Sequence, residues 1–439
     1  MNSLEVHIIG GGLAGCEAAW QLARRGHQVK LFDMKPNKFS PAHESENLAE
    51  LVCSNSLRSA DPHSAVGLLK DEMRTLDSLI MKAADETAVP AGKALAVDRE
   101  KFAEKITSLL TKHPLVSIIR EEIESLPEEP NSLTILATGP LTSEPLAESL
   151  ACFTGKTRLY FYDAIAPILY TESLDMEVIY QKSRYDDGPG DYLNCPLAEN
   201  DYLQFIDSLN TARYAPLRDF EEVKYFEGCL PIEVMSARGI DTLRYGPMKP
   251  VGLEDPRTNA QPYAVVQLRK ENKEGTLYNM VGFQTKLTRG EQERILRRIP
   301  GLERAEFARY GSIHRNTFIC APEILRPTLQ AKKNPNLLVA GQLSGVEGYV
   351  ESTAMGLLAG INAGRLLQSS EPLTPPPETA LGALINHLTA TDPNHFQPSN
   401  VNFGLFPAWE KKVAKRLRGQ IRAERSSTAL KQWIEAYRV

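Results

Sequence analysis

The sequence predicts an α/β fold in which a Rossmann-type domain, contributed by both ends of the chain, is interrupted by an inserted α+β domain. Three observations predict it. A strand, a glycine-rich turn, a helix and a second strand follow one another at the N-terminus. Short aromatic runs separated by Gly/Pro turns fill the middle of the chain. A buried strand and a helix then return. We expect residues 1–160 and 310–371 to form the Rossmann-type domain, 161–309 the inserted domain and 372–439 a basic helical segment.

The first of these observations is a complete βαβ unit. Residues 6–9 predict a buried strand, and the glycine-rich turn follows at once. Residues 16–25 are alanine-rich and predict a helix, while residues 28–32 predict a second strand that ends at Asp33. Strand, turn, helix and terminal acid in this order are typical of a dinucleotide-binding unit, whereas a glycine pattern alone is not.

Each residue type in this unit has a physical role. Gly10 permits the tight turn out of the strand, Gly12 lets the backbone approach a pyrophosphate, and Gly15 lets the helix pack closely on the sheet. The helix N-terminus attracts the anion, and the Asp33 carboxylate accepts hydrogen bonds from ribose hydroxyls. The expected cofactor-binding residues of this unit are Gly10, Gly11, Gly12, Leu13, Ala14, Gly15 and Asp33.

Later segments favour FAD as the dinucleotide. The strand predicted at 133–137 ends in Ala-Thr-Gly, a companion of the first βαβ unit in FAD proteins. A helix at about 351–367 is rich in alanine and glycine, which allow close backbone approach to a sheet or a cofactor. Tyr349, just before it, either stacks on a ring or caps the sheet. We therefore expect an FAD-binding, glutathione-reductase-like domain, with further cofactor contacts from Thr138, Gly139, Gly341, Gln342, Gly348 and Tyr349.

Composition excludes several classes of protein. The chain has 439 residues, a formal net charge of −5 and 42% hydrophobic residues, which is ordinary for a soluble protein. No apolar run approaches the roughly 20 residues that cross a bilayer, and no basic leader precedes the first strand. We therefore expect a cytoplasmic protein with no membrane partner. The six cysteines form no C-x-x-C pair and no zinc-like cluster, so neither a disulfide framework nor a metal site is expected.

Long and uncommon segments carry a more specific signal. They are GGGLAGCEAAWQLARRG, SPAHESENLAELVCSNSL, VPAGKALAVDREKF, ILATGPLTSE, DYLNCP, YFEGCLPIE, YGPMKPVGLEDPRT, YAVVQLR, MVGFQT, YGSIHRNTF and AGQLSGVEGYVESTAMGLLAG. On these segments the chain resembles, along nearly its whole length, the folate- and FAD-dependent tRNA (uracil-5-)-methyltransferases, the TrmFO family. The flavoproteins that modify the tRNA wobble uridine are similar in kind but lack the SNSL and GPMKPVG stretches. The last sixty residues match only loosely.

The resemblance implies a reaction on tRNA. Uridine 54 of the T-loop gains a 5-methyl group, 5,10-methylenetetrahydrofolate provides the carbon, reduced FAD provides the electrons, and NADH or NADPH recharges the flavin. Uracil C5 becomes nucleophilic when a thiolate adds at C6, and a base in a folded loop must first be extruded. Cys53 and Cys229 match the family's two functional cysteines. We expect Cys229 to attack C6, and Cys53 to assist methylene handling or C5 deprotonation near the flavin.

Other interpretations remain open on the residues alone. A cysteine is more often a buried apolar residue than a reactive thiol. The chain is alternatively a small-molecule flavin oxidoreductase with Cys53 and Cys229 as a redox pair, a wobble-uridine enzyme, or a tRNA-binding flavoprotein with a structural cofactor. The redox pair is disfavoured because the two thiols lie in different predicted domains. Lys249 and Arg269 either meet folate carboxylates or tRNA phosphate, or belong to the solvated surface.

The C-terminal segment is basic and has a helical pattern. Val413, Leu417 and Ile421 form an i, i+4 stripe, which predicts a helix that docks by this stripe and leaves its basic face in solvent. The same basic face would suit contacts with tRNA phosphates. The cations are Lys411, Lys412, Lys415, Arg416, Arg418, Arg422 and Arg425.

Overall fold

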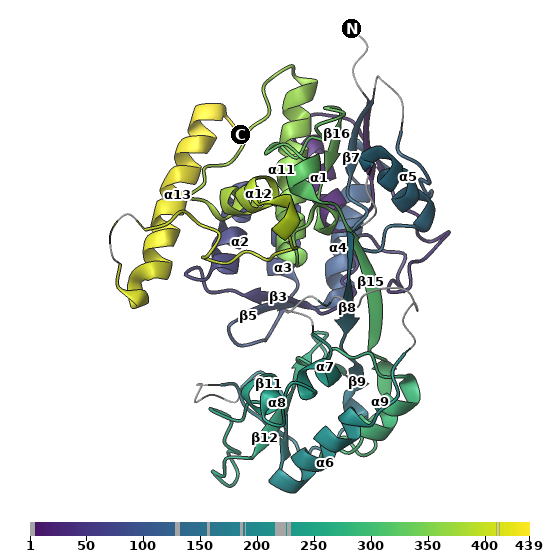
Figure 1. The fold of residues 1–439 in the computed structure, drawn as a ribbon, viewed down its shortest axis with the longest axis vertical. Coiled ribbons are helices and arrows are strands. Elements are labelled where there is room, and N and C mark those ends of the chain that lie inside the picture. Colours follow the sequence, from purple (N-terminus) through teal and green to yellow (C-terminus); the bar gives the residue numbers. More distant parts are fainter. Residues whose placement is uncertain are drawn as a thin grey trace.

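The structure is a computed structural model that describes residues 5–127, 132–155, 159–184, 188, 190–215, 225, 230–409, 411 and 413–439. Figure 1 shows two bodies, one above the other. We call residues 5–155 and 319–439 the sheet body, and residues 166–311 the inserted lobe. A two-stranded ribbon joins them, so the chain leaves the sheet body and returns to it at one place.

A five-stranded sheet in the order β16-β7-β1-β2-β6 forms the centre of the sheet body. Every pair in it is parallel, and β7 is buried along its whole length. Parallel strands place their carboxyl ends at one edge, which is where ligands bind in folds of this class. The strands are β1 (Glu5–Ile9), β2 (Val29–Phe32), β6 (Val116–Ile119), β7 (Ser132–Leu136) and β16 (Leu337–Val339).

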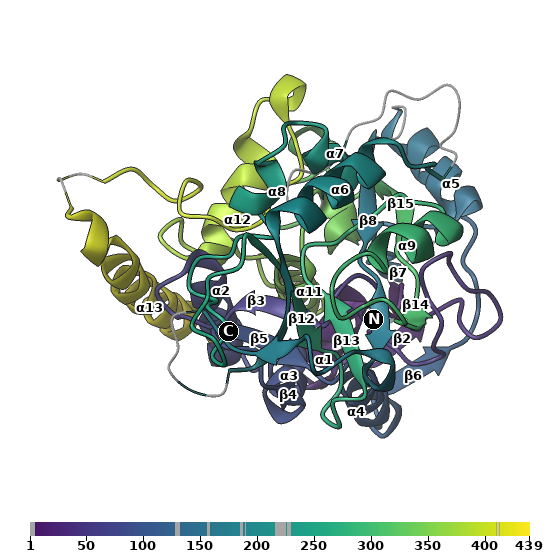
Figure 2. The ribbon, with the colours of Figure 1, turned by 90° about the horizontal axis from the view of Figure 1, so that it is seen from below.

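Helices cover this sheet and extend the sheet body sideways. Several begin at side-chain caps: the Asp98 carboxylate accepts from the backbone N–H of Lys101, and Ser64 and Ser78 cap two more helices. In both ribbon views α5 and α13 lie on opposite flanks (Figures 1 and 2). The helices are α1 (Leu13–Ala23), α2 (Ala65–Thr75), α3 (Leu79–Glu86), α4 (Arg99–Thr111), α5 (Glu144–Thr154), α10 (Ala321–Ile324), α11 (Tyr349–Leu367), α12 (Ala380–Ala390) and α13 (Arg418–Tyr437), with short 3-10 turns η3 (Gln342–Ser344), η4 (Pro393–His395) and η5 (Lys415–Leu417).

The small residues of α11 bring this helix against α1. A Cβ added at Gly356 would overlap the backbone of Ala14, and one at Gly360 would lie 2.8 Å from the carbonyl oxygen of Ala18. Contacts this close exclude any side chain larger than hydrogen. The sequence predicted that this helix approaches a sheet or a cofactor closely, and in the structure its close contact is with helix α1. Because α1 carries the glycine-rich turn at its N-terminus, the crossing also fixes the two helix starts relative to each other.

The inserted lobe has a sheet and a core of its own. Its six strands run in the order β10-β11-β12-β13-β9-β14, and every pair is antiparallel. Buried aromatic side chains such as Tyr202, Phe205 and Phe283 fill its core. The elements are β9 (Ile168–Tyr170), β10 (Tyr180–Gln181), β11 (Tyr192–Leu197), β12 (Ala264–Lys270), β13 (Leu277–Met280), β14 (Phe307–Arg309), α6 (Glu199–Asn210), α7 (Ile232–Ser236), α8 (Thr242–Tyr245), α9 (Arg289–Leu296) and the 3-10 turn η1 (Thr171–Ser173).

Two small sheets lie where the bodies meet. The ribbon pairs β8 (Leu159–Ile165) with β15 (Ser312–Phe318) in antiparallel register. A three-stranded sheet, β3 (Ser56–Ser59), β5 (Ala94–Val97) and β4 (Ala88–Val89), forms the edge of the sheet body that faces the lobe in Figure 1. The segment that contains Cys53 leads directly into β3 and therefore lies at this junction.

The C-terminal helix docks through different residues from those predicted. Helix α13 begins at Arg418, so Val413 and Leu417 precede it, and Leu417 is 41% exposed. Leu430 and Trp433 are the buried apolar anchors instead. The predicted stripe was wrong because it assumed a helix that starts before residue 413. None of the helices that the structure describes is both long and apolar enough to cross a membrane.

Candidate active site

One pocket in the sheet body collects most of the expected cofactor-binding residues. It opens at the carboxyl ends of the parallel strands, beside the N-termini of α1 and α11. The predicted residues there come from four parts of the chain: the glycine-rich turn, the end of β2, the segment after β7 and the segment after β16. The predicted residues that line the pocket are Gly10, Gly11, Gly12, Leu13, Ala14, Asp33, Thr138, Gly139, Gly341, Gln342 and Tyr349.

The glycines of the first turn differ in what surrounds them. Gly10 has a φ of +108°, and a Cβ there would lie 2.5 Å from the carbonyl oxygen of Ala137. A Cβ at Gly15 would overlap the carbonyl oxygen of Gly10, so this residue permits the helix to pack on the turn; Gly15 does not line the pocket. A Cβ at Gly12 would meet no protein atom within 4 Å. At Gly12, therefore, no side chain separates the backbone from the space of the pocket.

The start of α1 is suited to an anion. Gly12 is its N-cap residue, no side chain caps the helix, and its first turn contains no acidic residue. Free backbone N–H groups and the positive end of the helix dipole thus face the pocket beside a backbone without a side chain. This arrangement fits the pyrophosphate of a dinucleotide.

Asp33 lies at the end of β2 and is 8% exposed. One carboxylate oxygen accepts the backbone N–H of Gly11 at 3.1 Å, and the other accepts the backbone N–H of Lys35 at 2.8 Å. These two bonds orient the carboxylate at the wall of the pocket. A carboxylate oxygen has two lone pairs, so each can still accept from a ligand hydroxyl.

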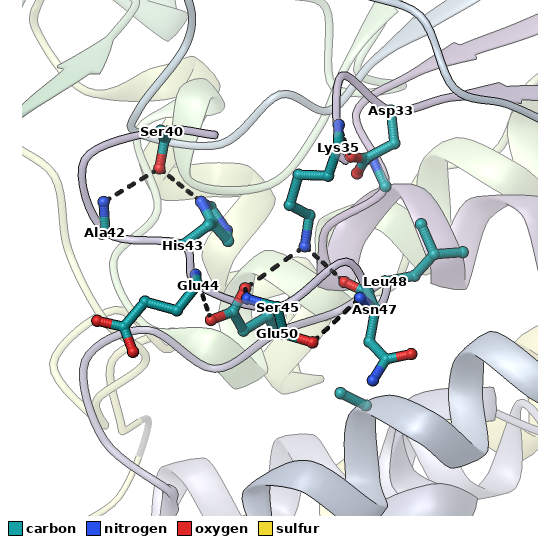
Figure 3. Close-up of polar contacts among 12 residues, drawn as sticks. Asp33, Lys35, Ser40, Ala42, His43, Glu44, Ser45, Asn47, Leu48 and Glu50 are labelled. Atoms are coloured by element: carbon teal, nitrogen blue, oxygen red, sulfur yellow. Dashed lines mark hydrogen bonds and ion pairs between the residues drawn. The ribbon is translucent and has the colours of Figure 1, made fainter. Parts of the chain in front are cut away.

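The loop after Asp33 supplies pocket residues that sequence reasoning missed (Figure 3). Lys35 Nζ lies 3.5 Å from the Glu50 carboxylate, and both side chains are almost fully buried. The backbone N–H groups of Glu44 and Ser45 also donate to Glu50, which closes the loop. Burial lowers the pKa of His43 to about 4, so this side chain is neutral. The sequence signal for His43, Glu44, Ser45 and Glu50 was the family segment SPAHESENLAELVCSNSL, whereas Lys35 lies outside every quoted segment.

Tyr349 links the pocket to Cys53. Its hydroxyl accepts the backbone N–H of Cys53 at 2.6 Å and that of Ser54 at 3.2 Å. Burial, followed by the nearby Cys53, raises the pKa of the Tyr349 hydroxyl, so it stays protonated. Cys53 itself is half-buried. Tyr349 thus lines the cofactor pocket and also holds the cysteine segment beside it, a role that neither of the two earlier interpretations included.

Two arginines hold the same segment from outside the pocket. Arg269, on β12 of the inserted lobe, donates to the Ser54 hydroxyl at 2.7 Å and to the Asn55 amide oxygen at 3.0 Å. It is 7% exposed, so the interpretation as solvated surface is wrong for this residue. Arg99 donates to the carbonyl oxygen of Leu51 at 2.5 Å and pairs with Glu271, again on the lobe. The cysteine segment is therefore clamped between the two bodies.

A buried carboxyl group, that of Glu347, lies next to the pocket residue Gln342. Gln342 donates its amide to Glu347 at 2.7 Å. Burial, followed by the neighbouring Asp163 carboxylate, raises the pKa of Glu347 well above its ordinary value. Gly348, predicted to contact the cofactor, adopts a φ of +107° and lies against Glu351 rather than along the pocket wall. Cys229 lies outside the described residues, so its position stays a prediction.

A parallel sheet with a glycine cradle at its first turn and a second helix start closing the same pocket defines a flavoprotein-type dinucleotide-binding protein. The family model for glucose inhibited division protein A (GidA) matches residues 5–371. Two crystal forms of Aquifex aeolicus GidA share the fold, with TM-scores of 0.71 and 0.69 at 18% identity. They cover 98% of this chain, which spans 73% and 76% of theirs.

Relatives of much higher identity narrow the family. A protein of Desulfotalea psychrophila, named methylenetetrahydrofolate–tRNA-(uracil-5-)-methyltransferase TrmFO, is 67% identical over 100% of this chain and 99% of its own. Proteins of the same name from Geobacter sulfurreducens and Syntrophus aciditrophicus are 58% and 57% identical, over 98% of this chain and 98% and 97% of theirs. The chain belongs to the TrmFO family, within the wider GidA family. The predicted family, fold class and enzyme class are confirmed.

Proposed function

We propose that this protein methylates C5 of uridine 54 in the tRNA T-loop, with 5,10-methylenetetrahydrofolate as carbon donor and FAD as its resident cofactor. The observation that carries this proposal is the Cys53 segment, which Tyr349 holds at the end of a glycine-cradled pocket in a TrmFO-family chain. NADH or NADPH provides the reducing equivalents, and the reaction takes place in the cytoplasm.

The residues of the pocket fit FAD. The bare backbone at Gly12 and the uncapped start of α1 would hold the pyrophosphate, and Asp33 would hold the ribose. Gly341 and Gln342, with the start of α11, would contact the flavin end. Reduced FAD, when bound, supplies the hydride that converts a methylene group on C5 into a methyl group.

The chain's own thiols activate the base. Addition of the Cys229 thiolate to C6 of the uracil places an enolate on the ring, and C5 then attacks the one-carbon unit of the folate. Cys53 stands beside the pocket and accepts the C5 proton or handles the methylene group. As C5 loses its proton, the bond between the one-carbon unit and the folate nitrogen breaks, so tetrahydrofolate leaves and a methylene group remains on C5. Once this group has become methyl, elimination of the Cys229 thiolate from C6 restores the uracil ring. The Tyr349 hydroxyl and Arg269 keep the Cys53 segment in place.

Single replacements test these roles. With folate labelled in its methylene carbon, we expect Cys229→Ala and Cys53→Ala to lose label transfer to tRNA by at least a factor of about 100. Cys152→Ala is the matched control, because Cys152 is exposed and does not line the pocket. A normal rate in Cys229→Ala would remove the nucleophile assignment.

Product analysis separates this proposal from its rivals. Digestion of the labelled tRNA should yield 5-methyluridine at position 54 and no label at the wobble position. Omission of tRNA, folate or flavin should each abolish transfer. Reduction of a small molecule without tRNA would favour the oxidoreductase instead. Bleaching of the visible flavin spectrum by NADH and by NADPH, compared at equal concentration, identifies the reductant.

A further inference from the structure

A basic hollow on the flank of the sheet body is not used by the proposed mechanism. It lies where the loop before α2, the segment before α13 and the first turns of α13 meet, and both ribbon views place α13 along this flank (Figures 1 and 2). Gly419 packs so closely on the backbone of His63 that a Cβ would overlap the His63 carbonyl oxygen. The residues that line the hollow include His63, Trp409, Lys415, Arg416, Arg418 and Arg422.

Aromatic rings hold one arginine of the hollow in place. The Arg422 guanidinium carbon lies 4.3 Å from the ring centre of Trp409 and 5.1 Å from that of Phe406. Phe403 and Phe406 meet edge to face at 5.4 Å, and Arg422 also donates to the carbonyl oxygen of Pro407. Stacking of this kind orders a guanidinium without neutralising it. Arg422 is therefore an ordered positive group in the wall of the hollow.

The described residues around this hollow leave its positive charge unbalanced. Among the residues that the structure describes, none of Lys415, Arg416, Arg418, Arg422 and Arg425 forms an ion pair. Burial lowers the pKa of Arg422, and the neighbouring Arg425 and Arg418 lower it further because like charges repel.

The position of these cations on the helix adds to the imbalance. They stand at the N-terminal end of α13, whose first turn has no acidic residue and no side-chain cap. Cations are unfavourable at the positive end of a helix, where anions are favoured. An anion bound in the hollow would relieve both the repulsion and the helix-dipole cost.

We infer that this hollow binds the phosphate backbone of tRNA at a place outside the T-arm, while the T-loop reaches the Cys53 junction. This inference rests on the proposed function, which makes tRNA the substrate. RNA is the polyanion that such an enzyme must hold, and lysines and arginines clustered on one face are typical of surfaces that bind a phosphate backbone. The hollow lies on the flank formed by α13, so it extends the contact beyond the junction.

The test removes charge without disturbing packing. Lys415→Gln/Arg416→Gln changes two exposed cations of the hollow, and Lys431→Gln/Arg438→Gln is the matched control at the other end of α13. Each holoenzyme is titrated with full-length tRNA between 50 and 200 mM salt. We expect the first variant to bind roughly tenfold more weakly near 100 mM salt and its salt slope to fall by about one to two units. The control should match the wild type.

Methylation kinetics on two substrates separate the possible failures. The first variant should show a raised KM and an unchanged kcat on full-length tRNA, and wild-type kinetics on an isolated T-arm stem-loop. Equal losses in both variants, an unchanged salt slope, or a lower kcat at unchanged KM would overturn the inference. If the wild type transfers no methyl group to either RNA, the proposed function itself fails, whatever the binding curves show.

Discussion

The sheet body and the inserted lobe are held together by different kinds of packing. In the sheet body, backbone meets backbone: Gly15 lies on the carbonyl of Gly10, and Gly356 lies on the backbone of Ala14. In the lobe, side chains fill the space, and Phe205 and Phe283 pack with ring centres 6.1 Å apart. Backbone contacts allow only glycine, whereas side-chain contacts tolerate many combinations. A cofactor site that depends on backbone contacts can therefore be predicted from its glycines. The packing of a lobe that depends on side-chain contacts cannot be predicted from single residues in the same way.

The largest combined effect, on stability and on cofactor content together, should come from Gly15→Ala. The new methyl group would overlap the Gly10 carbonyl oxygen, so α1 or the glycine turn must move. We expect a loss of about 3 kcal/mol or more in the free energy of unfolding and purification without bound FAD. Denaturant unfolding and the flavin absorbance measure the two effects.

Two controls sharpen this result. Gly12→Ala adds the same methyl group to open space, so stability without FAD should change by less than about 0.5 kcal/mol while FAD affinity falls. Gly290→Ala lies within α9 of the lobe, where nothing is within 4 Å, and should gain about 0.5–1 kcal/mol. If Gly15→Ala retained FAD at full occupancy, the close backbone contact at Gly15 would not be required for the cofactor site.

The next effect concerns the lobe alone. Phe283 is 1% exposed, and Phe283→Ala should destabilise the lobe by about 3–5 kcal/mol because a cavity replaces the ring. Since the lobe has its own core, hydrogen exchange should accelerate there while the strands of the sheet body stay protected and FAD stays bound. Met176→Ala, at a 50% exposed position of the same lobe, is the control. Loss of FAD from Phe283→Ala would show that the two packings are not independent.

The smallest effect tests how the C-terminal helices are attached. The Glu72 carboxylate accepts backbone N–H groups at the start of α12, from Ala380 and Leu381, and the hydroxyl of Ser426 on α13. Burial raises the pKa of Glu72 from 4.5 to about 7. The folded protein keeps this proton to a higher pH than the unfolded chain, so the stability contributed at Glu72 falls as the pH rises between these values.

Glu72→Gln isolates this contribution because glutamine does not titrate. The difference in the free energy of unfolding between wild type and Glu72→Gln should fall by up to about 3 kcal/mol from pH 4.5 to pH 7. Asp71→Asn, an exposed neighbour on the same helix, serves as control and should show little change over this range. Thermal or urea unfolding at several pH values measures it, and a difference that stays constant or grows would contradict the assignment.

The glycine turn and the parallel sheet could be predicted because residues close together in the sequence both form these elements and meet the steric requirements of the cofactor site. Gly10, Gly12 and Asp33 meet at the pocket that the βαβ pattern implies. Lys35 and Glu50 line the same pocket but were missed, since their place depends on how a long polar loop folds back. How this loop folds depends on contacts between residues that are distant in the sequence, and such contacts produce no periodic pattern of residue types.

Two other differences have equally specific causes. For Arg269 a place on the solvated surface was slightly favoured over a ligand contact, but β12 lies inside the lobe's sheet and directs the side chain to Ser54 and Asn55. The tail stripe failed because helix α13 begins only at Arg418. The roles of the two cysteines and the domain boundaries stay predictions, and Cys229 lies in a segment outside the described residues.

The ribbon of β8 and β15 has a consequence for how such a protein can arise. Leu159 is paired with Phe318, and the pairing continues to Ile165 and Ser312, so the exit and the re-entry of the chain lie side by side. A segment with adjoining ends can be gained or lost by a gene in one event while the surrounding fold keeps its backbone contacts. The lobe is in this sense a cassette. Arg269 and Glu271 show what such a segment must add, because they contact the Cys53 segment and Arg99 of the sheet body from within the lobe.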